Sequence, residues 1–413
     1  MKTRTVGATA NPGNLPGQPF FSTTEQRLSL ARQRYFEEGV RPSGLVSETV
    51  IQSWSRCLQA QRQPGDAVAF ATVTTSRAHS AMTRSRVLLE AASGELKQLA
   101  STLSGTSCTM FLTDPQGVVV HYAYADHHAD EVLLPLARRV GCNLSEESIG
   151  TNAPGLTAHT GEASVVMGAE HFFGGVQVMH CAAAPIRDIH GQMAGVLDLT
   201  SESRPFRFDA AAVVGLYATA IENHLLRAQS TDHIVIQLQT SPAFLGTPME
   251  GLAGVAPDGR IAWMNRAASR LLGTAARGAS LNAEAALALT ASHLAALTRT
   301  RQPTSHRLPN GLQVWLLLRM QARDGAAERV FNMPAFQSST APSNTPSVKG
   351  ETSTHGEPSD APLPETLRRG ELQLIEKALA SFQGNVSRAA RSLGVSRGLI
   401  YRHLKQAKQP ASH

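Results

Sequence analysis

Cations are concentrated in the last fifty residues of this 413-residue chain, and guanidinium and ammonium groups are the side chains that bind phosphate. Residues 363–413 hold nine Lys and Arg against three Glu, a net charge of +6. The whole chain, with 38 Lys and Arg against 32 Asp and Glu, also has a net charge of +6, so the preceding 362 residues are neutral in sum. A neutral body with a basic end is expected when that end contacts nucleic acid.

The spacing of apolar residues predicts a helix over residues 364–382, followed by two shorter helices around a turn. Ala389 and Ala390 are small enough to let two helices cross closely. Gly394 suits the turn, and Ser396 can cap the next helix. A solvated basic helix without a nucleic-acid role is the alternative. The coincidence of small pair, turn and cap favours an all-α helix-turn-helix that binds double-stranded DNA.

Arginine at the start of a recognition helix can donate to O6 and N7 of guanine, and Arg397 has this position. Arg388, Arg402 and Lys405 are expected to contact the phosphate backbone. The full set of candidate DNA-binding residues is Ser387, Arg388, Ser396, Arg397, Leu399, Tyr401, Arg402 and Lys405.

Residues 385–404 resemble the Fis-type helix-turn-helix that ends many bacterial enhancer-binding regulators. One position departs from the pattern, because Leu399 stands where Thr is common. The matching residues are Asn385, Ala389, Ala390, Leu393, Gly394, Ser396, Arg397, Tyr401, Arg402 and Leu404.

Upstream of this end, we expect residues 1–22 to be disordered, residues 24–86 to be helical and residues 87–226 to form a mixed α/β domain. Two turns, at 114–117 and 187–191, lie between apolar runs and predict antiparallel hairpins. A long helix is expected over 208–229. The strand candidates are 109–113, 118–122, 164–167, 180–185 and 193–199.

A smaller α/β domain is expected over residues 243–330, with a strand at 251–256, a turn at 257–259, a returning strand at 260–264 and a helix that Asn265 caps. Residues 333–362 are rich in Ser, Thr and Pro, which predicts a flexible linker. Residues 363–408 then form the helix-turn-helix domain. The expected fold class is therefore multidomain α+β.

Residues 44–275 resemble the sensory half of acetoin-catabolism-regulator-type transcription factors. The resemblance implies a GAF domain over 87–226 and a PAS-like domain over 243–330, both folds that sense small molecules, and a dimer. It is carried by Ser53-Trp-Ser-Arg-Cys57, Leu112-Thr-Asp114, Glu147-Ser-Ile-Gly-Thr-Asn152, Gly168-Ala-Glu-His-Phe172, Cys181-Ala-Ala-Ala-Pro-Ile-Arg-Asp188, Gly195-Val-Leu-Asp-Leu199, Ile221-Glu222, Asp258-Gly-Arg-Ile261 and Asn265-Arg-Ala-Ala268.

The polar residues in these strings are candidates for contact with an unknown small-molecule effector. Turn and helix-cap chemistry at 150–152, and a buried Cys181 that acts as a small hydrophobe, are the structural alternatives. The candidates are Glu147, Thr151, Asn152, Glu170, His171 and Cys181.

Six histidines fall between His121 and His180, but their spacing predicts no metal site and no cofactor. The four cysteines are widely spaced, which predicts free thiols and no thiol pair for redox catalysis. No apolar run reaches the ~18 residues of a membrane span, and no secretory signal opens the chain. We therefore expect a cytoplasmic, nucleoid-associated protein that is not an enzyme.

No G-x-x-x-x-G-K-[ST] loop occurs in the sequence, and the nearest string, at 254–261, is expected to be a hairpin turn. Relatives usually carry an ATPase module that remodels sigma-54 polymerase between sensor and DNA-binding end. The sequence thus predicts an effector-sensing regulator without ATPase activity, expected as a homodimer. It would act by recruitment of RNA polymerase, by occlusion, or by pairing with a full-length partner. A co-regulator paired with a full-length ATPase-bearing relative and a Fis-like architectural DNA binder are the alternatives.

Overall fold

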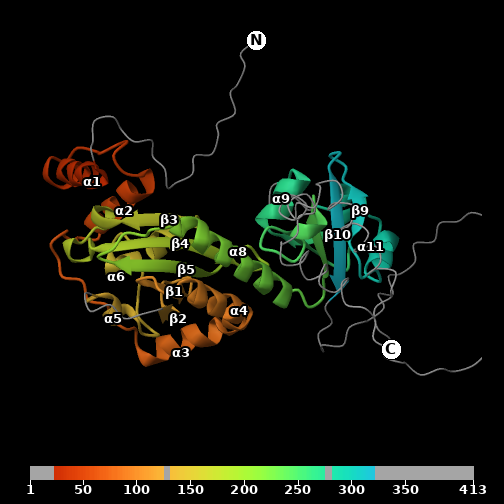
Figure 1. Ribbon diagram of the computed structural model, residues 1–413, viewed down its shortest axis with the longest axis horizontal. Coiled ribbons are helices and arrows are strands. Elements are labelled where there is room, and N and C mark those ends of the chain that lie inside the picture. The colour runs from red at the N-terminus through yellow and green to blue at the C-terminus, as the bar shows by residue number, and fades with distance from the viewer. Residues whose placement is uncertain (1–22, 125–130, 275–280, 321–413) are drawn as a thin grey trace, which may run out of the picture. The chain divides into compact units, whose positions relative to one another are not determined.

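The computed structural model describes residues 23–124, 131–274 and 281–320 (Figure 1). The chain divides into two compact units, Met1–Ala335 and Phe336–His413, and all described residues belong to the first. The segments predicted as the disordered N-terminus, the linker and the DNA-binding helices lie outside the described residues. Two antiparallel sheets organise the first unit.

The first sheet has the strand order β2-β1-β5-β4-β3, and each neighbouring pair is antiparallel. The two predicted hairpins are confirmed as β1–β2 and β4–β5. In the first turn, Oδ1 of Asp114 accepts from the backbone amides of Gln116 and Val118, which fixes the tight return of the chain. The strands are β1 (Cys108–Thr113), β2 (Val119–Tyr124), β3 (Ser164–Met167), β4 (Met179–Arg187) and β5 (Met193–Glu202).

Alternation along the strands divides the core into two layers, because successive side chains point to opposite faces. In β1, Met110 and Leu112 join the layer under helices α4 (Arg86–Thr102) and α8 (Ala210–Ala228), whereas Phe111 joins the layer on the opposite face. Helix α8 confirms the helix predicted over 208–229 and begins at Asp209, whose side chain accepts from the amide of Ala212.

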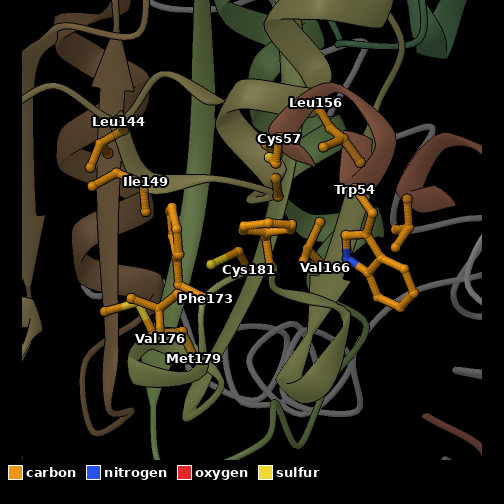
Figure 2. Close-up of a cluster of buried hydrophobic side chains, with 14 of the residues drawn as sticks. Trp54, Cys57, Leu144, Ile149, Leu156, Val166, Phe173, Val176, Met179 and Cys181 are labelled. Atoms are coloured by element: carbon orange, nitrogen blue, oxygen red, sulfur yellow. The ribbon is translucent and has the colours of Figure 1, made fainter. Parts of the chain in front are cut away.

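The opposite face of the first sheet is covered by the helical N-terminus and by short helices that lie between β2 and β3. Trp54 of α2 is fully buried in this layer, and Figure 2 shows it in one cluster with Val166 and Cys181 of the sheet. The predicted N-terminal helices therefore share their core with the first sheet. The helices on this face are α1 (Thr24–Arg32), α2 (Glu48–Gln59), α5 (Leu134–Ala137), α6 (Glu146–Ile149) and α7 (Ala153–Thr160). Helix α3 (Thr75–Arg84) instead packs its buried Ala81 into the α4–α8 layer.

The second sheet has the order β8-β7-β6-β10-β9, again antiparallel throughout. The predicted strand, turn, returning strand and Asn265 cap are confirmed, since Asn265 accepts from the amide of Ala268. Sequence reasoning missed the central strand β6, which precedes the predicted start at 243. The elements are β6 (Ile234–Gln239), β7 (Gly251–Val255), β8 (Ile261–Met264), α9 (Arg266–Leu272), α10 (Ala283–Leu287), α11 (Ala291–Leu297), β9 (Thr304–Arg307) and β10 (Gln313–Met320).

Candidate functional site

A small cavity of about 30 Å³ lies between the first sheet and the segments that cover it from α5 to the loop before β4. A water molecule needs ~10–15 Å³ on this measure, so the cavity has room for a few heavy atoms. Its walls are mostly carbon, with a polar group where β4 and β5 pair. The lining residues are Phe70, Phe111, Leu134, Ala137, Leu144, Ile149, Asn152, Pro154, His171, Met179, Cys181, Asp198 and Thr200.

The strand register brings the polar side chains together. Asp198 and Thr200 are two residues apart on β5, so both face the layer that contains the cavity, while Leu197 and Leu199 face the α4–α8 layer. Cys181 on β4 is the cross-strand partner of Thr200. All three side chains are therefore fixed by sheet geometry.

Four contacts within hydrogen-bond distance form a row. Three of them join the side chains of Asp198, Thr200, Cys181 and His171 in that order, and the fourth joins His171 to a backbone carbonyl oxygen. Oγ1 of Thr200 lies 2.7 Å from Oδ2 of Asp198 and 3.3 Å from Sγ of Cys181. Sγ of Cys181 lies 3.5 Å from Nε2 of His171, and Nδ1 of His171 lies 3.0 Å from the carbonyl oxygen of Gly168.

The number of protons in the row decides its direction. Because the Gly168 carbonyl only accepts, Nδ1 of His171 carries its proton and Nε2 accepts from the Cys181 thiol. Thr200 has one hydroxyl proton, and it donates that proton to Oδ2 of Asp198, the shorter of its two contacts.

Burial shifts the pKa values of the groups in the row. Burial raises the pKa of Asp198 to about 8 and lowers the pKa of His171 to about 4, so carboxyl and imidazole are both uncharged near neutral pH. Burial also raises the pKa of the Cys181 thiol far above its usual range, which keeps it a weak nucleophile. The row can hold and orient a ligand, but it offers no activated nucleophile.

One polar atom of the row has no partner. Oδ1 of Asp198 is buried and makes no hydrogen bond to any described residue, although the whole side chain is 0% exposed. An unsatisfied buried acceptor costs about 1–3 kcal/mol and is uncommon in folded proteins.

The sequence-predicted candidates divide into two groups. Asn152, His171 and Cys181 line the cavity, although the Asn152 amide is engaged in turn and cap bonds to Gly150 and Gly155, as the structural alternative proposed. Glu147, Thr151 and Glu170 lie outside the lining.

Each of the three residues outside the cavity has another role or position. Glu147 is exposed. The hydroxyl of Thr151 lies 2.7 Å from that of Ser53, and the Glu170 carboxylate accepts from the amide of Met167. Burial nevertheless raises the pKa of Glu170 to about 7.

Sequence reasoning missed Asp198 and Thr200. The available signal was a single Asp between apolar residues of a predicted strand, at Gly195-Val-Leu-Asp-Leu199. An ionisable residue at an otherwise apolar buried position is a candidate for function, because its burial is costly unless it has partners.

The loop that supplies His171 is held in place by the N-terminal helices. The guanidinium of Arg32 donates to the carbonyl oxygens of Ala169, His171 and Phe172 at 3.2, 2.7 and 3.0 Å. The indole nitrogen of Trp54 donates to the carbonyl of Glu170 at 2.8 Å. Helices α1 and α2 thus fix one wall of the cavity.

Other chemistry finds little support in the described part of the chain. No three His, Cys, Asp or Glu side chains are grouped there as metal ligands. All four cysteines are buried free thiols, which confirms that prediction. Within the described ranges no helix is long and apolar enough to cross a membrane.

Two family models match the chain. Residues 22–218 match the model described as MimR, N-terminal domain, and residues 366–406 match the model described as bacterial regulatory protein, Fis family. The first match contains α1–α4, the whole first sheet and part of α8. The second confirms the Fis-type resemblance of the basic C-terminal segment.

Homologous regulators occur in other bacteria. The acetoin catabolism regulatory protein of Cupriavidus necator is 31% identical over 235 residues, which cover 55% of this chain and 35% of that protein. The propane 2-monooxygenase operon transcriptional activator MimR of Mycolicibacterium smegmatis is 28% identical over 307 residues, 73% of this chain and 47% of that protein. The chain thus spans less than half the length of these relatives, which are transcriptional regulators.

A solved structure, the E. coli DhaR(N)–DhaL complex, contains a chain that is 18% identical and fully covered, over 67% of this chain, with a TM-score of 0.41. Likeness at this TM-score supports no conclusion about the present fold or its function.

Proposed function

We propose that this chain is a bacterial transcription regulator that binds DNA through residues 363–408 and senses a small molecule through its first sheet. The match of residues 366–406 to the Fis family, on the segment that carries the net positive charge of the chain, is the observation that carries the proposal. The homologous regulators support it.

The sensor in this proposal is a GAF domain built on the first sheet, and the second sheet is a PAS-like domain. The small cavity beside a row of buried polar groups supports sensing by the first of the two. A homodimer would place two DNA-binding ends on a pseudo-palindromic operator.

We further propose that this chain acts without hydrolysing ATP itself, because its sequence holds no phosphate-binding P-loop. Regulation would then proceed through contact with RNA polymerase, through occlusion of a promoter, or beside an ATPase-bearing relative. Effector binding changes the arrangement of the dimer, and the long helix α8 carries that change toward the second sheet.

Selection of bound sequences from random duplex DNA by the full chain tests the proposal. We expect a pseudo-palindrome, with half-sites about one helical turn apart. On that operator, Arg397→Ala should relax base preference at one position by about tenfold, because a bidentate guanine contact is lost. Lys405→Ala should weaken all sequences alike.

Arg77→Ala, on α3 of the neutral body, is the matched control and should leave DNA binding unchanged. Enrichment of no sequence, with equal binding of random duplexes, would replace the proposal with a Fis-like architectural role. Enrichment only in the presence of a full-length relative would favour the co-regulator.

A further inference from the structure

We propose that the β9–β10 side of the second sheet contacts the phosphate backbone of duplex DNA, in addition to the contact made by the Fis-type segment. The contact is made by four exposed arginines, named here the β9–β10 arginines: Arg299, Arg301, Arg307 and Arg319. The inference rests on the proposed function, because the duplex is the one that the chain binds as a regulator.

The neutral sum of residues 1–362 conceals a division of charge between the two sheets. Residues 23–230, which contain the first sheet, hold 16 Lys and Arg against 20 Asp and Glu, a net charge of −4. Residues 231–320, which contain the second sheet, hold eight Arg against four acids, a net charge of +4. No Asp or Glu occurs from residue 285 to residue 320, and all four β9–β10 arginines lie in this stretch. One part of the second domain is therefore strongly basic.

Strand register places two of these arginines on the face of the second sheet that is turned away from its core. Alternate residues of β10 are buried in that core, which leaves Gln313 and Arg319 on the outer face. Arg307 is the cross-strand partner of Gln313, so it is on the outer face as well. It belongs to β9, the strand at the edge of the sheet (Figure 1).

The other two arginines, Arg299 and Arg301, lie in the connection from α11 to β9. Strand β9 begins at Thr304, which pairs with Leu316 of β10, so the connection reaches the half of the sheet in which β10 continues to Arg319. Six residues separate the ends of this surface along β10, a length of about 20 Å. Duplex DNA presents one phosphate charge per ~1.7 Å of its axis, so a surface of this length can lie opposite several phosphates.

The guanidinium groups of the β9–β10 arginines have no hydrogen-bond or ion-pair partner among the described residues. Two other arginines of the second domain differ in this respect, because Arg260 pairs with Asp258 at 2.6 Å and Arg266 pairs with Glu162 at 3.0 Å. An unpaired guanidinium group keeps all five N–H donors in the planar arrangement that matches phosphate oxygens. The four arginines are thus available for an anionic partner.

Duplex DNA is the anionic partner that these observations favour. The second domain is tethered to the Fis-type segment, so a duplex bound by that segment is at high effective concentration for the arginines. Single-stranded nucleic acid would require open aromatic side chains for stacking, but Trp315 of this face is half-buried. Arginine contacts with phosphate carry no sequence information, so they add affinity and salt dependence without base preference.

The salt dependence of duplex binding tests the inference. Binding of the full chain to a random duplex of ~40 base pairs is measured by fluorescence anisotropy between about 50 and 200 mM salt. Each phosphate contact contributes about 0.9 to the slope of log K against log salt concentration. Arg307→Gln with Arg319→Gln should therefore lower the slope by about 1.8 and weaken binding roughly tenfold at about 100 mM salt.

Two further double variants separate charge from position. Arg307→Lys with Arg319→Lys keeps both charges and should keep the slope of the unchanged chain. Arg77→Gln with Arg270→Gln is the matched control, because both residues are exposed and unpaired among the described residues, on α3 and on α9. Helix α9 packs on the core face of the second sheet, so the control should leave the slope unchanged. Melting temperatures should be the same for all variants, since the substituted residues are exposed.

The possible outcomes separate this inference from the proposed function. An unchanged slope in Arg307→Gln with Arg319→Gln, or an equal loss in the control, would overturn the inference and leave the regulator standing. Loss of binding to anionic phospholipid vesicles, with DNA binding unchanged, would assign the arginines to lipid head groups and would also overturn it. A lowered slope in a chain that selects no operator sequence would support the second contact while the proposed regulator fails. A chain that binds no duplex would overturn both.

Discussion

At the level of single residues, Asp198 illustrates what a sequence alone conceals. The residue is a lone carboxylic acid in an apolar strand, and its surroundings combine Thr200, two residues away, with Cys181 and His171, which lie 17 and 27 residues away in the chain. His171 and Cys181 were identified from their family strings. Their direction of hydrogen bonding follows only from the distances to Thr200 and Gly168. Spacing could not supply the single unpartnered atom on which the candidate site depends.

The buried carboxyl of Asp198 should make stability depend on pH. Its pKa is raised from 3.8 in the unfolded chain to about 8 in the folded protein, so its contribution to stability is complete below pH 4 and is lost as pH rises to 8. Asp198→Asn does not ionise. We therefore expect the free energy of unfolding of the unchanged protein to fall relative to the variant between pH 4 and 8, by up to ~1.4 kcal/mol per pH unit.

Urea denaturation of both proteins across this pH range measures the difference. Glu170 and His171 titrate in both proteins, so the comparison isolates Asp198. Asp209→Asn changes an exposed carboxyl at the start of α8, where Asn caps equally well, and should produce no such divergence. Parallel stability curves for the unchanged protein and Asp198→Asn would show that the carboxyl is ionised in the fold.

At the level of elements, the sequence was sufficient to predict hairpins and helices wherever a local signal existed. Turn residues at 114–117 and 187–191 predicted two hairpins, and a long apolar run predicted α8. Strand β6 was missed because only five residues separate its Ile-Val-Ile-Gln-Leu run from the apolar helix α8. Its place at the centre of the second sheet is set by pairing with β7 and β10, which are distant in sequence.

A second element-level feature joins α8 to the second sheet. The side-chain amide of Asn265 at the start of α9 donates to Oδ1 of Asn223 on α8 at 2.9 Å, and both residues are buried. The Asn265 oxygen accepts from the amides of Leu252 and Ala268. Every hydrogen-bonding group of Asn265 is thereby used, which gives the proposed coupling through α8 a rigid point of attachment.

Arg32 should hold the wall of the cavity that carries His171. Arg32→Met keeps the length of the side chain but removes the donors to three carbonyl oxygens of the 169–172 loop. We expect a loss of about 2–3 kcal/mol in the free energy of unfolding, because these carbonyls lose a charged partner. Urea denaturation measures it.

Arg34→Met serves as the matched control, since Arg34 is exposed two residues further along, in the helical segment Gln33–Glu37 that continues α1, and it should change stability by less than about 0.5 kcal/mol. A loss in Arg32→Met no larger than in the control would mean that the N-terminal helices do not position the loop.

At the level of the whole molecule, residues 1–362 are neutral in sum and contain a small cavity, and a basic Fis-type segment follows them. Neither part alone implies regulation by a ligand. Charge counting and motif spacing could predict the DNA-binding end because its chemistry is local in sequence. The polar row beside the cavity could not be predicted in this way, because it depends on the register of β4 and β5.

The most direct test of the proposed ligand-responsive regulator is genome-wide occupancy of the tagged full chain, in cells grown with and without the carbon sources whose catabolic genes lie near its binding sites. We predict a few sharp peaks over one pseudo-palindrome, with occupancy that changes with one of these compounds, and weaker, less selective peaks in Arg397→Ala. Broad occupancy without a common sequence, or sharp peaks that ignore every ligand, would contradict the account.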